Sequence, residues 1–298
     1  MDIDHSCIED QAFAVGESFM AAVYQHRVEQ PKTARRVTHS IACMECLLAQ
    51  FSPISLPEMD HVALLDRTDT KFIMRTSQLA WALQSLADQY RVLEINHTRL
   101  NHYQTLYFDT PDFTLYRQHH NGMRTRYKVR VREYLDSHVS YWEVKQKTNC
   151  NRTIKARLRA PDSTADGDDL IDEFLNTHVP FDANELEPKL WNRFLRMTLV
   201  SKYRPERLTL DVNLEFRWGD AYVTMPGIAV AEVKQARSSP RSDFLEHMRQ
   251  LHIRPNAFSK YCAGVYMLYD GVKSNNFKSQ MRLVNRLIQE ELDHEYAG

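Results

Sequence analysis

The stretch from Arg124 to Arg132 reads Arg-Thr-Arg-Tyr-Lys-Val-Arg-Val-Arg, with a basic residue at every second position. Alternate side chains of a β-strand point to opposite faces, so the basic residues would share one face. Neighbours on that face lie about 6–7 Å apart and repel each other by roughly 2–3 kcal/mol at an effective dielectric of about 20. A strand that tolerates this repulsion needs acidic neighbours or an anionic ligand. The stretch therefore predicts a site for a polyanion.

Positive charge is concentrated around this stretch. The chain has 298 residues, is 43% hydrophobic and carries a net charge of −1, which suits one large globular domain and does not favour nucleic-acid binding overall. Between Arg117 and Arg159, however, twelve residues are Lys or Arg, and only Glu133, Asp136 and Glu143 are acidic. The charge is local, which favours a defined anion site over a generally basic surface.

The sequence shows neither a targeting segment nor a membrane segment. No apolar run approaches the roughly 18–20 residues of a membrane helix, and the first residues lack the pattern of a signal peptide. The five cysteines are scattered, which is typical of reduced thiols. Cys43 and Cys46 form a single CxxC motif without the second pair of a typical zinc site. We therefore expect a cytoplasmic protein without a membrane span.

We expect an accessory N-terminal segment (1–55), a main domain (56–272) and a C-terminal helix (273–298). Hydrophobic periodicity predicts strands at 63–74, 91–96, 103–108, 123–134, 139–147, 152–160, 194–203, 207–218 and 221–235. It predicts helices at 41–51, 76–90, 111–120, 169–177, 186–193, 242–251, 260–269 and 280–292. We interpret His119 and His120 as a solvated helix end.

At least six predicted strands combine one apolar face with one charged face. Residues 207–217 alternate throughout, with Leu208 to Phe216 on one face and Thr209 to Arg217 on the other. An antiparallel sheet with a solvated face would explain any one strand. Because six agree and Arg dominates the charged faces, we favour a sheet closed into a barrel. Its charged faces would line the interior, and helices would cover the apolar outside.

These elements resemble, in order, the polyphosphate polymerase domain of the VTC (vacuolar transporter chaperone) family, within the CYTH-like triphosphate tunnel metalloenzyme superfamily. The resemblance covers roughly residues 55–270. The matching motifs are Arg67-Thr-Asp69-Thr-Lys71-Phe72, Leu106-Tyr-Phe-Asp109-Thr-Pro111-Asp112, Lys128-Val-Arg130-Val-Arg132, Glu143-Val-Lys145-Gln-Lys147, Thr153-Ile-Lys155-Ala-Arg157, Tyr203-Arg204, Leu210 to Phe216, Ala231-Glu232-Val-Lys234 and Phe258-Ser-Lys260-Tyr261. The first strand carries Arg-x-Asp-x-Lys where the superfamily typically has Glu-x-Glu-x-Lys, which fits the VTC branch better.

The resemblance implies an α+β fold built on an eight-stranded antiparallel β-barrel tunnel with a basic lumen and outer helices. It implies a catalytic set of Lys71, Arg130, Arg132 and Lys145. Phosphate-binding residues would be Arg67, Lys128, Lys147, Lys155, Arg157, Arg204, Lys234 and Lys260. Mn²⁺ or Mg²⁺ would be held by Glu232 first and by Glu143 or Glu215, with Asp211 as a further candidate. Hard divalent cations prefer such oxygen ligands.

Three functions stay open at this point. The first is a polyphosphate polymerase that transfers the γ-phosphoryl group of ATP to a growing chain. The second is a hydrolase of the same fold that cleaves inorganic triphosphate or a nucleoside triphosphate. The third is a non-catalytic subunit that binds polyphosphate or nucleotide. The expected partners are ATP or another triphosphate and polyphosphate, without nucleic acid, and a separate membrane partner is left open.

Overall fold

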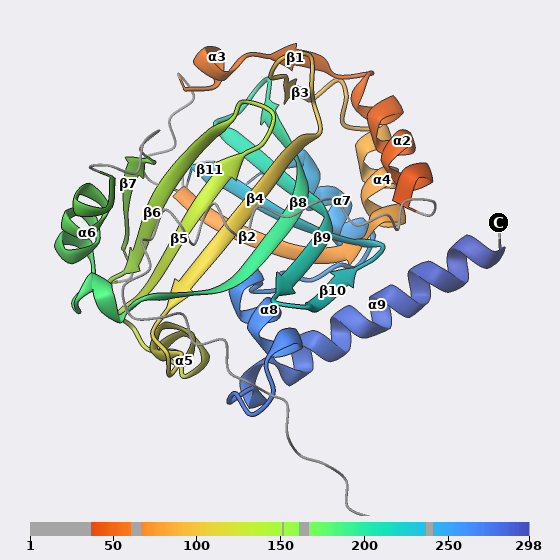
Figure 1. Cartoon of the computed structure of the whole chain (residues 1–298). Helices are drawn as coiled ribbons and strands as arrows, with labels where there is room; N and C mark the ends of the chain where they lie inside the picture. Colours follow the sequence, from red (N-terminus) through yellow and green to blue (C-terminus); the bar gives the residue numbers. More distant parts are fainter. Residues whose placement is uncertain (1–36, 61–66, 151, 161–166, 237–240, 298) are drawn as a thin grey trace, which may run out of the picture.

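An antiparallel sheet curls into a half-barrel of eight strands, with helices around it (Figure 1). The computed structural model describes residues 37–60, 67–150, 152–160, 167–236 and 241–297. In spatial order the strands are β2 (Arg67–Arg75), β11 (Ile228–Ala236), β9 (Glu206–Trp218), β8 (Glu187–Ser201), β4 (Asn101–Asp109), β5 (Arg126–Tyr134), β6 (Val139–Lys147) and β7 (Thr153–Arg159). This confirms the predicted α+β fold. We call the concave interior of the sheet the tunnel.

Short elements extend this sheet. The strand β1 (Ser52–Ile54) pairs in parallel with β3 (Tyr90–Leu93), which joins β8, and β10 (Ala221–Met225) forms a hairpin with β9. The helices are α2 (Val37–Leu48), α3 (Leu56–Asp60), α4 (Thr76–Gln84), α5 (Thr114–His120), α6 (Gly167–His178), α7 (Asp243–Gln250), α8 (Lys260–Leu268) and α9 (Lys278–Ala297), with 3-10 turns η1 (Ala183–Glu185) and η2 (Asn275–Phe277).

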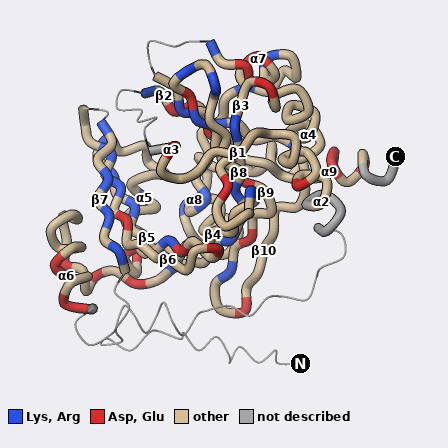
Figure 2. Tube along the Cα trace, turned by 90° about the horizontal axis from the view of Figure 1, so that it is seen from above, with Lys and Arg blue, Asp and Glu red and all other residues tan. Residues whose placement is uncertain are grey.

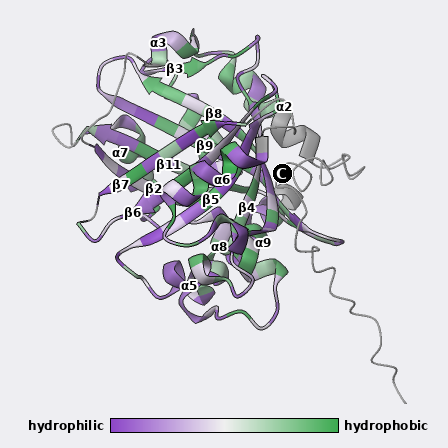
Figure 3. Cartoon of the chain, turned by 60° about the vertical axis from the view of Figure 1, so that its left-hand side comes forward, coloured by the Kyte–Doolittle hydropathy of each residue, from purple (hydrophilic) through white to green (hydrophobic). Residues whose placement is uncertain are grey.

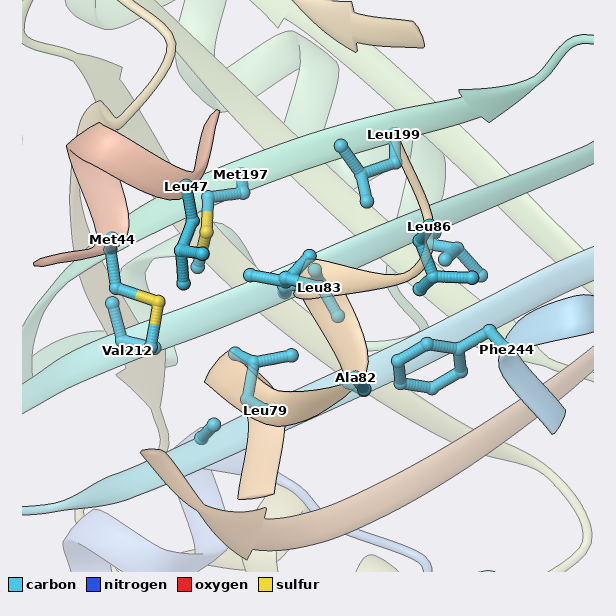
Figure 4. Close-up of a cluster of buried hydrophobic side chains, with 14 of the residues drawn as sticks. Met44, Leu47, Leu79, Ala82, Leu83, Leu86, Met197, Leu199, Val212 and Phe244 are labelled. Atoms are coloured by element: carbon cyan, nitrogen blue, oxygen red, sulfur yellow. The ribbon is translucent and has the colours of Figure 1, made fainter. Parts of the chain in front are cut away.

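The convex face of β2, β11, β9 and β8 buries its apolar side chains under α4 and α7. Figure 4 shows Leu79 and Leu83 of α4 in one cluster with Met197 and Leu199 of β8 and Phe244 of α7. Full burial of such a side chain contributes about 1.5–3 kcal/mol. Since apolar residues occupy this side of each strand, the alternating residues turn toward the tunnel, and Figure 3 shows the resulting alternation of hydrophobic and hydrophilic residues.

The helix α2 adds Met44, Leu47 and Leu48 to the same hydrophobic cluster. Part of the segment expected to be accessory therefore shares the core of the sheet. On the other side of the half-barrel, α6 places Ile171 and Leu175 against apolar residues of β5 and β6. The apolar stripes of these helices thus keep the outer face of the sheet away from water.

Three helices, α5, α8 and α9, gather below one end of the half-barrel (Figure 1). They share a hydrophobic cluster in which Tyr116, Tyr261 and Val284 are buried. Ser259 caps α8, because its hydroxyl accepts a hydrogen bond from the backbone N–H of Cys262 at 3.3 Å. The predicted helix after Ser242 is confirmed, and the Ser242 hydroxyl caps α7 in the same way.

Two of the predicted secondary-structure elements are wrong. Residues 186–193, predicted as a helix, belong mainly to the 15-residue strand β8. Most of this strand is buried on both faces, so its apolar residues lack the period of two that marks a half-exposed strand. Residues 221–235, predicted as one strand, form β10 and β11, and the chain turns at Gly227, which has a positive φ of 66°. None of the described helices combines the length and apolar character of a membrane span.

Candidate active site

The register of β5, β6 and β7 brings their basic side chains into rows across the tunnel. Lys128 pairs with Lys145, which pairs with Lys155 on the next strand. One step along, Arg130 pairs with Glu143, which pairs with Arg157. Lys147 shares the face of Lys145 two residues away. Figure 2 shows the concentration of Lys and Arg on β7 and the strands beside it.

Glu143 balances part of this charge. Its carboxylate accepts a hydrogen bond from Arg130 Nε at 2.7 Å and forms an ion pair with Arg130 Nη2 at 2.6 Å, while Arg132 Nε lies 4.0 Å away. Burial of the Glu143 side chain raises its pKa, but the charges of Arg130 and then Arg132 outweigh burial and lower the pKa to about 2. Glu143 is therefore ionised at neutral pH and is held by arginines.

Arg132 is compensated less well than Arg130. Its side chain is only 11% exposed, and its buried Nε has no hydrogen-bond partner among the described residues. Burial, followed by the charge of Arg130, lowers the pKa of Arg132, yet a guanidinium stays protonated in proteins. Such a group is costly until an anion binds it. The tunnel thus holds a buried cation suited to a phosphate oxygen.

A second charged row crosses β2, β11 and β9. Glu232 pairs in register with Lys71 on one side and Thr209 on the other. Its carboxylate lies 2.6 Å from Lys234 Nζ and 3.7 Å from Lys71 Nζ. Burial raises the pKa of Glu232, but the lysines, Lys234 first, hold it well below its usual range. Further along β2, Arg67 and Asp69 form an ion pair at 2.9 Å.

Arg196 is a tunnel residue that the sequence prediction missed. Its guanidinium donates two hydrogen bonds to Asp211, from Nε to Oδ1 at 2.5 Å and from Nη2 to Oδ2 at 2.7 Å. Lys260 also contacts Asp211. Its guanidinium lies over the ring of Tyr103, 4.9 Å from the centroid, which fixes its direction. A single Arg within the apolar run 194–200 was the available signal.

Residues 256–260, here called the floor segment, lie across the end of the tunnel next to α8. Lys71 Nζ donates a hydrogen bond to the backbone oxygen of Phe258 at 3.2 Å, and Lys128 Nζ donates one to Ser259 Oγ at 2.8 Å. Lys260 reaches Asp211 from the same segment. Strands β2 and β5, on opposite sides of the tunnel, are therefore both hydrogen-bonded to the floor segment.

Glu215 lies apart from Glu143 and Glu232. Between Arg193 and Leu195 the β8–β9 register shifts, and Asn213 takes a positive φ of 53°. Beyond this bulge Leu214 and Phe216 join the cluster around α8, whereas Glu215 turns to the opposite face. Burial raises the pKa of Glu215 there, and the charge of Arg193 offsets part of that rise. The alternation predicted for residues 207–217 is therefore wrong after Val212, and the structure does not bring the three predicted metal ligands together.

Arg204 is also separate from the tunnel residues. It lies in the turn between β8 and β9, and its Nη1 is 3.7 Å from Asp243 Oδ2 at the start of α7. Its side chain is 34% exposed. This ion pair connects the turn to α7 at the rim of the half-barrel.

The prediction of a solvated helix end at His119 and His120 is wrong. His120 is 3% exposed, its Nε2 accepts a hydrogen bond from the backbone N–H of Asn276 at 3.2 Å, and its backbone oxygen accepts one from Asn276 Nδ2 at 2.8 Å. His119 lies against Phe277, with ring centroids 6.0 Å apart. The end of α5 is thus packed against η2.

The described residues contain no group of three or more His, Cys, Asp or Glu arranged to hold a metal ion. Mg²⁺-type sites that act on phosphates commonly use one or two carboxylates and complete their coordination with water and phosphate oxygens. A single carboxylate among basic side chains is compatible with this pattern. Glu232 offers one beside Lys71 and Lys234.

Comparison with protein families gave a match to the model described as the VTC domain, over residues 66–269. The sequence has no match among the curated proteins. Among solved structures, a Bacillus halodurans protein described as an adenylate cyclase is similar, with 13% identity, a TM-score of 0.44, and coverage of 65% of this chain and 94% of that one.

Two further solved structures show a similar level of likeness. A Hippeastrum protein, described as an adenylyl cyclase with a dominant triphosphatase activity, has 13% identity and a TM-score of 0.42, covering 67% of this chain and 96% of that one. A Vibrio parahaemolyticus protein described as an adenylate cyclase has 14% identity and a TM-score of 0.39, covering 65% and 94%.

Proposed function

Because the chain belongs to the VTC domain family, we propose that it is a polyphosphate polymerase that transfers the γ-phosphoryl group of ATP to a polyphosphate chain in the tunnel. The observation that carries this proposal is the buried Arg132, whose Nε has no hydrogen-bond partner among the described residues. It lies beside Arg130 and Arg196, so the tunnel has more positive charge than its carboxylates balance. Phosphate oxygens supply the missing negative charge.

The tunnel side chains suit phosphoryl transfer, which needs charge neutralisation and in-line positioning more than a protein nucleophile. Arg130 and Arg132 present planar guanidinium groups that bind phosphate oxygens through two hydrogen bonds at once. Lys71, Lys145 and Lys128 contribute compact charges from facing strands. We assign these residues to the transferred group and its neighbours along the phosphate chain.

Other predicted residues take supporting places in this proposal. Lys155, Arg157 and Lys147, from β6 and β7, would bind the continuing phosphate chain, together with Arg67 of β2. Lys234 contacts the Glu232 carboxylate, and Lys260 contacts the Asp211 carboxylate. In this proposal both lysines also contribute positive charge to the bound phosphate. Glu143 keeps Arg130 in its orientation through one hydrogen bond to Nε and an ion pair with Nη2.

We assign Mn²⁺ or Mg²⁺ to Glu232. When bound, the divalent ion neutralises phosphate charge and polarises the bond that breaks. Glu232 would supply one protein ligand, and substrate oxygens and water the others. Lys71 and Lys234 would then release the carboxylate and turn to phosphate.

The experiment is a reaction of the full chain with ATP and Mn²⁺, followed by phosphorus NMR and by gel electrophoresis of the products. We expect ADP and acid-labile phosphate chains of increasing length, with internal phosphate resonances that grow over time. Free phosphate in amounts equal to ADP, without chains at any time, would show that the protein is a hydrolase and not a polymerase. Metal-dependent binding without turnover would indicate a non-catalytic subunit.

A further inference from the structure

A pocket lies next to the floor segment and is separate from the tunnel residues described above. It has a volume of about 400 Å³ and is lined by His119, Asn256, Asn276, Phe277, Ser279 and Gln280, among others. This volume falls within the roughly 300–1,000 Å³ of small-molecule sites. The lining contributed by the described residues contains amides, a hydroxyl and aromatic rings but no Asp, Glu, Lys or Arg. The pocket therefore suits a neutral, hydrogen-bonding group.

The aromatic side of the pocket is held rigidly. Phe277 packs against Tyr116 at 5.7 Å and against His120 at 5.3 Å between ring centroids, in addition to its contact with His119. His120 is itself fixed by two hydrogen bonds with Asn276. A planar ligand would thus meet a preformed aromatic surface.

His119, which lines the pocket, has one ring nitrogen without a hydrogen bond. Its Nδ1 is buried and has no hydrogen-bond partner among the described residues. Burial and then the charges of Lys128 and Arg126 lower the pKa of His119 to about 2, so the ring is neutral at physiological pH. A neutral ring offers a stacking surface and one donor or acceptor, but it gives no attraction for phosphate.

The pocket and the tunnel share a wall. Asn256 lines the pocket, and its backbone N–H donates a hydrogen bond of 2.8 Å to the backbone oxygen of Lys71. Two residues further along, Phe258 accepts from Lys71 Nζ, and Ser259 accepts from Lys128 Nζ. A neutral, aromatic pocket thus lies beside a strongly cationic tunnel.

We propose that this pocket binds the nucleobase of the nucleoside triphosphate whose phosphate groups enter the tunnel. The assignment rests on the proposed function for the phosphate side and on the neutral pocket for the base side. Phe277 and His119 stack with the base. Gln280 Nε2, Asn256 Oδ1 and Asn276 Nδ2 already bond within the protein, so the base edge would meet the other amide atoms, Asn256 Nδ2, Asn276 Oδ1 and Gln280 Oε1. The pocket would thereby distinguish a nucleotide donor from inorganic phosphate chains.

The test uses the full chain and the substitution Ser279→Leu. Ser279 is exposed and lines the pocket, so leucine would block the pocket without entering the core or adding an aromatic ring. The matched control is Asn285→Leu, an exposed position elsewhere on α9. Adenosine binding is followed by saturation-transfer NMR at millimolar concentration, and ATP and inorganic triphosphate binding by calorimetry.

We expect wild type and Asn285→Leu to bind adenosine, and Ser279→Leu to lose this signal. Affinity for ATP should fall roughly tenfold in Ser279→Leu, the scale of a lost base–aromatic stack. Affinity for inorganic triphosphate should stay unchanged. The assignment is overturned if wild type does not bind adenosine, if Ser279→Leu still does, or if ATP and inorganic triphosphate weaken equally. Wild type that binds adenosine but not inorganic triphosphate would instead overturn the proposed function of the tunnel.

Discussion

Arg196 and Asp211 face each other on neighbouring strands and form a two-bond ion pair inside the tunnel, with N–O distances of 2.5 and 2.7 Å. Asp211 is only 4% exposed and also contacts Lys260. One carboxylate therefore holds a cation from β8 and a cation from the floor segment. This arrangement makes Asp211 an anchor of the site, because both of its oxygens are already occupied by protein groups.

We expect Asp211→Asn to lower the free energy of unfolding by about 3–5 kcal/mol, because removing one partner leaves buried charges without compensation. Urea denaturation at neutral pH measures this change. The control is Asp69→Asn. In the ion pair that it removes, the side chain of Arg67 is 25% exposed and that of Asp69 is 34% exposed. Exposed pairs contribute roughly 0–1 kcal/mol. Equal effects of the two substitutions would contradict the anchoring role.

Arg132→Met should separate stability from binding. The variant removes a buried cation that lacks a hydrogen bond at Nε, so its melting temperature should equal or exceed that of the wild type. Its affinity for inorganic triphosphate should fall at least tenfold, since hydrogen bonds to charged groups contribute about 1.5–3 kcal/mol. Calorimetric titration and thermal unfolding measure the two quantities.

The control for Arg132 is Arg282→Met, at an exposed position on α9. This variant should keep both the melting temperature and the triphosphate affinity of the wild type. An Arg132→Met protein that is less stable but binds triphosphate normally would show that Arg132 has a structural role.

The lowered pKa of Lys128 should give the free energy of unfolding and the triphosphate affinity opposite dependences on pH. Burial lowers its pKa to about 7, against about 10.4 for lysine in an unfolded chain. Between these values the unfolded chain binds more protons than the folded one, so Lys128 makes stability rise as pH increases from about 7 to about 10. A bound triphosphate favours the charged lysine, so affinity should fall over the lower part of this range.

Calorimetry at pH 8 in buffers of different ionisation enthalpy should detect proton uptake on triphosphate binding. Lys128→Met should reduce that uptake and flatten both pH profiles. The control Lys278→Met changes an exposed lysine on α9 and should leave the profiles as they are. Proton uptake that is unchanged in Lys128→Met would assign the titration to another group.

The alternation of charge made much of the tunnel predictable. A period of two assigns Lys128, Arg130 and Arg132 to one face regardless of which strands lie beside them. The pairing of Arg130 with Glu143 was not predictable in the same way, because cross-strand partners depend on register. Sequence therefore identified the charged face, while the structure identified which charges are compensated.

The bulge at Asn213 shows why one predicted metal ligand was misplaced. A single extra residue reverses the facing of every side chain beyond it, so Glu215 leaves the face of Asp211. Asn tolerates a positive φ better than most residues, and its presence within an apolar strand was a weak signal. The pocket beside His119 gave no signal, since its residues come from α5, the floor segment, η2 and α9.

The proposed metal site can be tested through binding alone. We expect Mn²⁺ to strengthen inorganic triphosphate binding by the wild type and to have no such effect on Glu232→Gln, which keeps the size of the side chain but removes its charge. Without metal, the variant should bind at least as tightly as wild type, because Lys71 and Lys234 lose their competing carboxylate. Calorimetric titrations with and without Mn²⁺ give all four affinities.

Glu143→Gln is the matched control and should keep the response to Mn²⁺, since Arg130 occupies that carboxylate. A full Mn²⁺ response in Glu232→Gln would rule out Glu232 as the ligand, and its loss in Glu143→Gln alone would move the metal to the β5–β6 side of the tunnel.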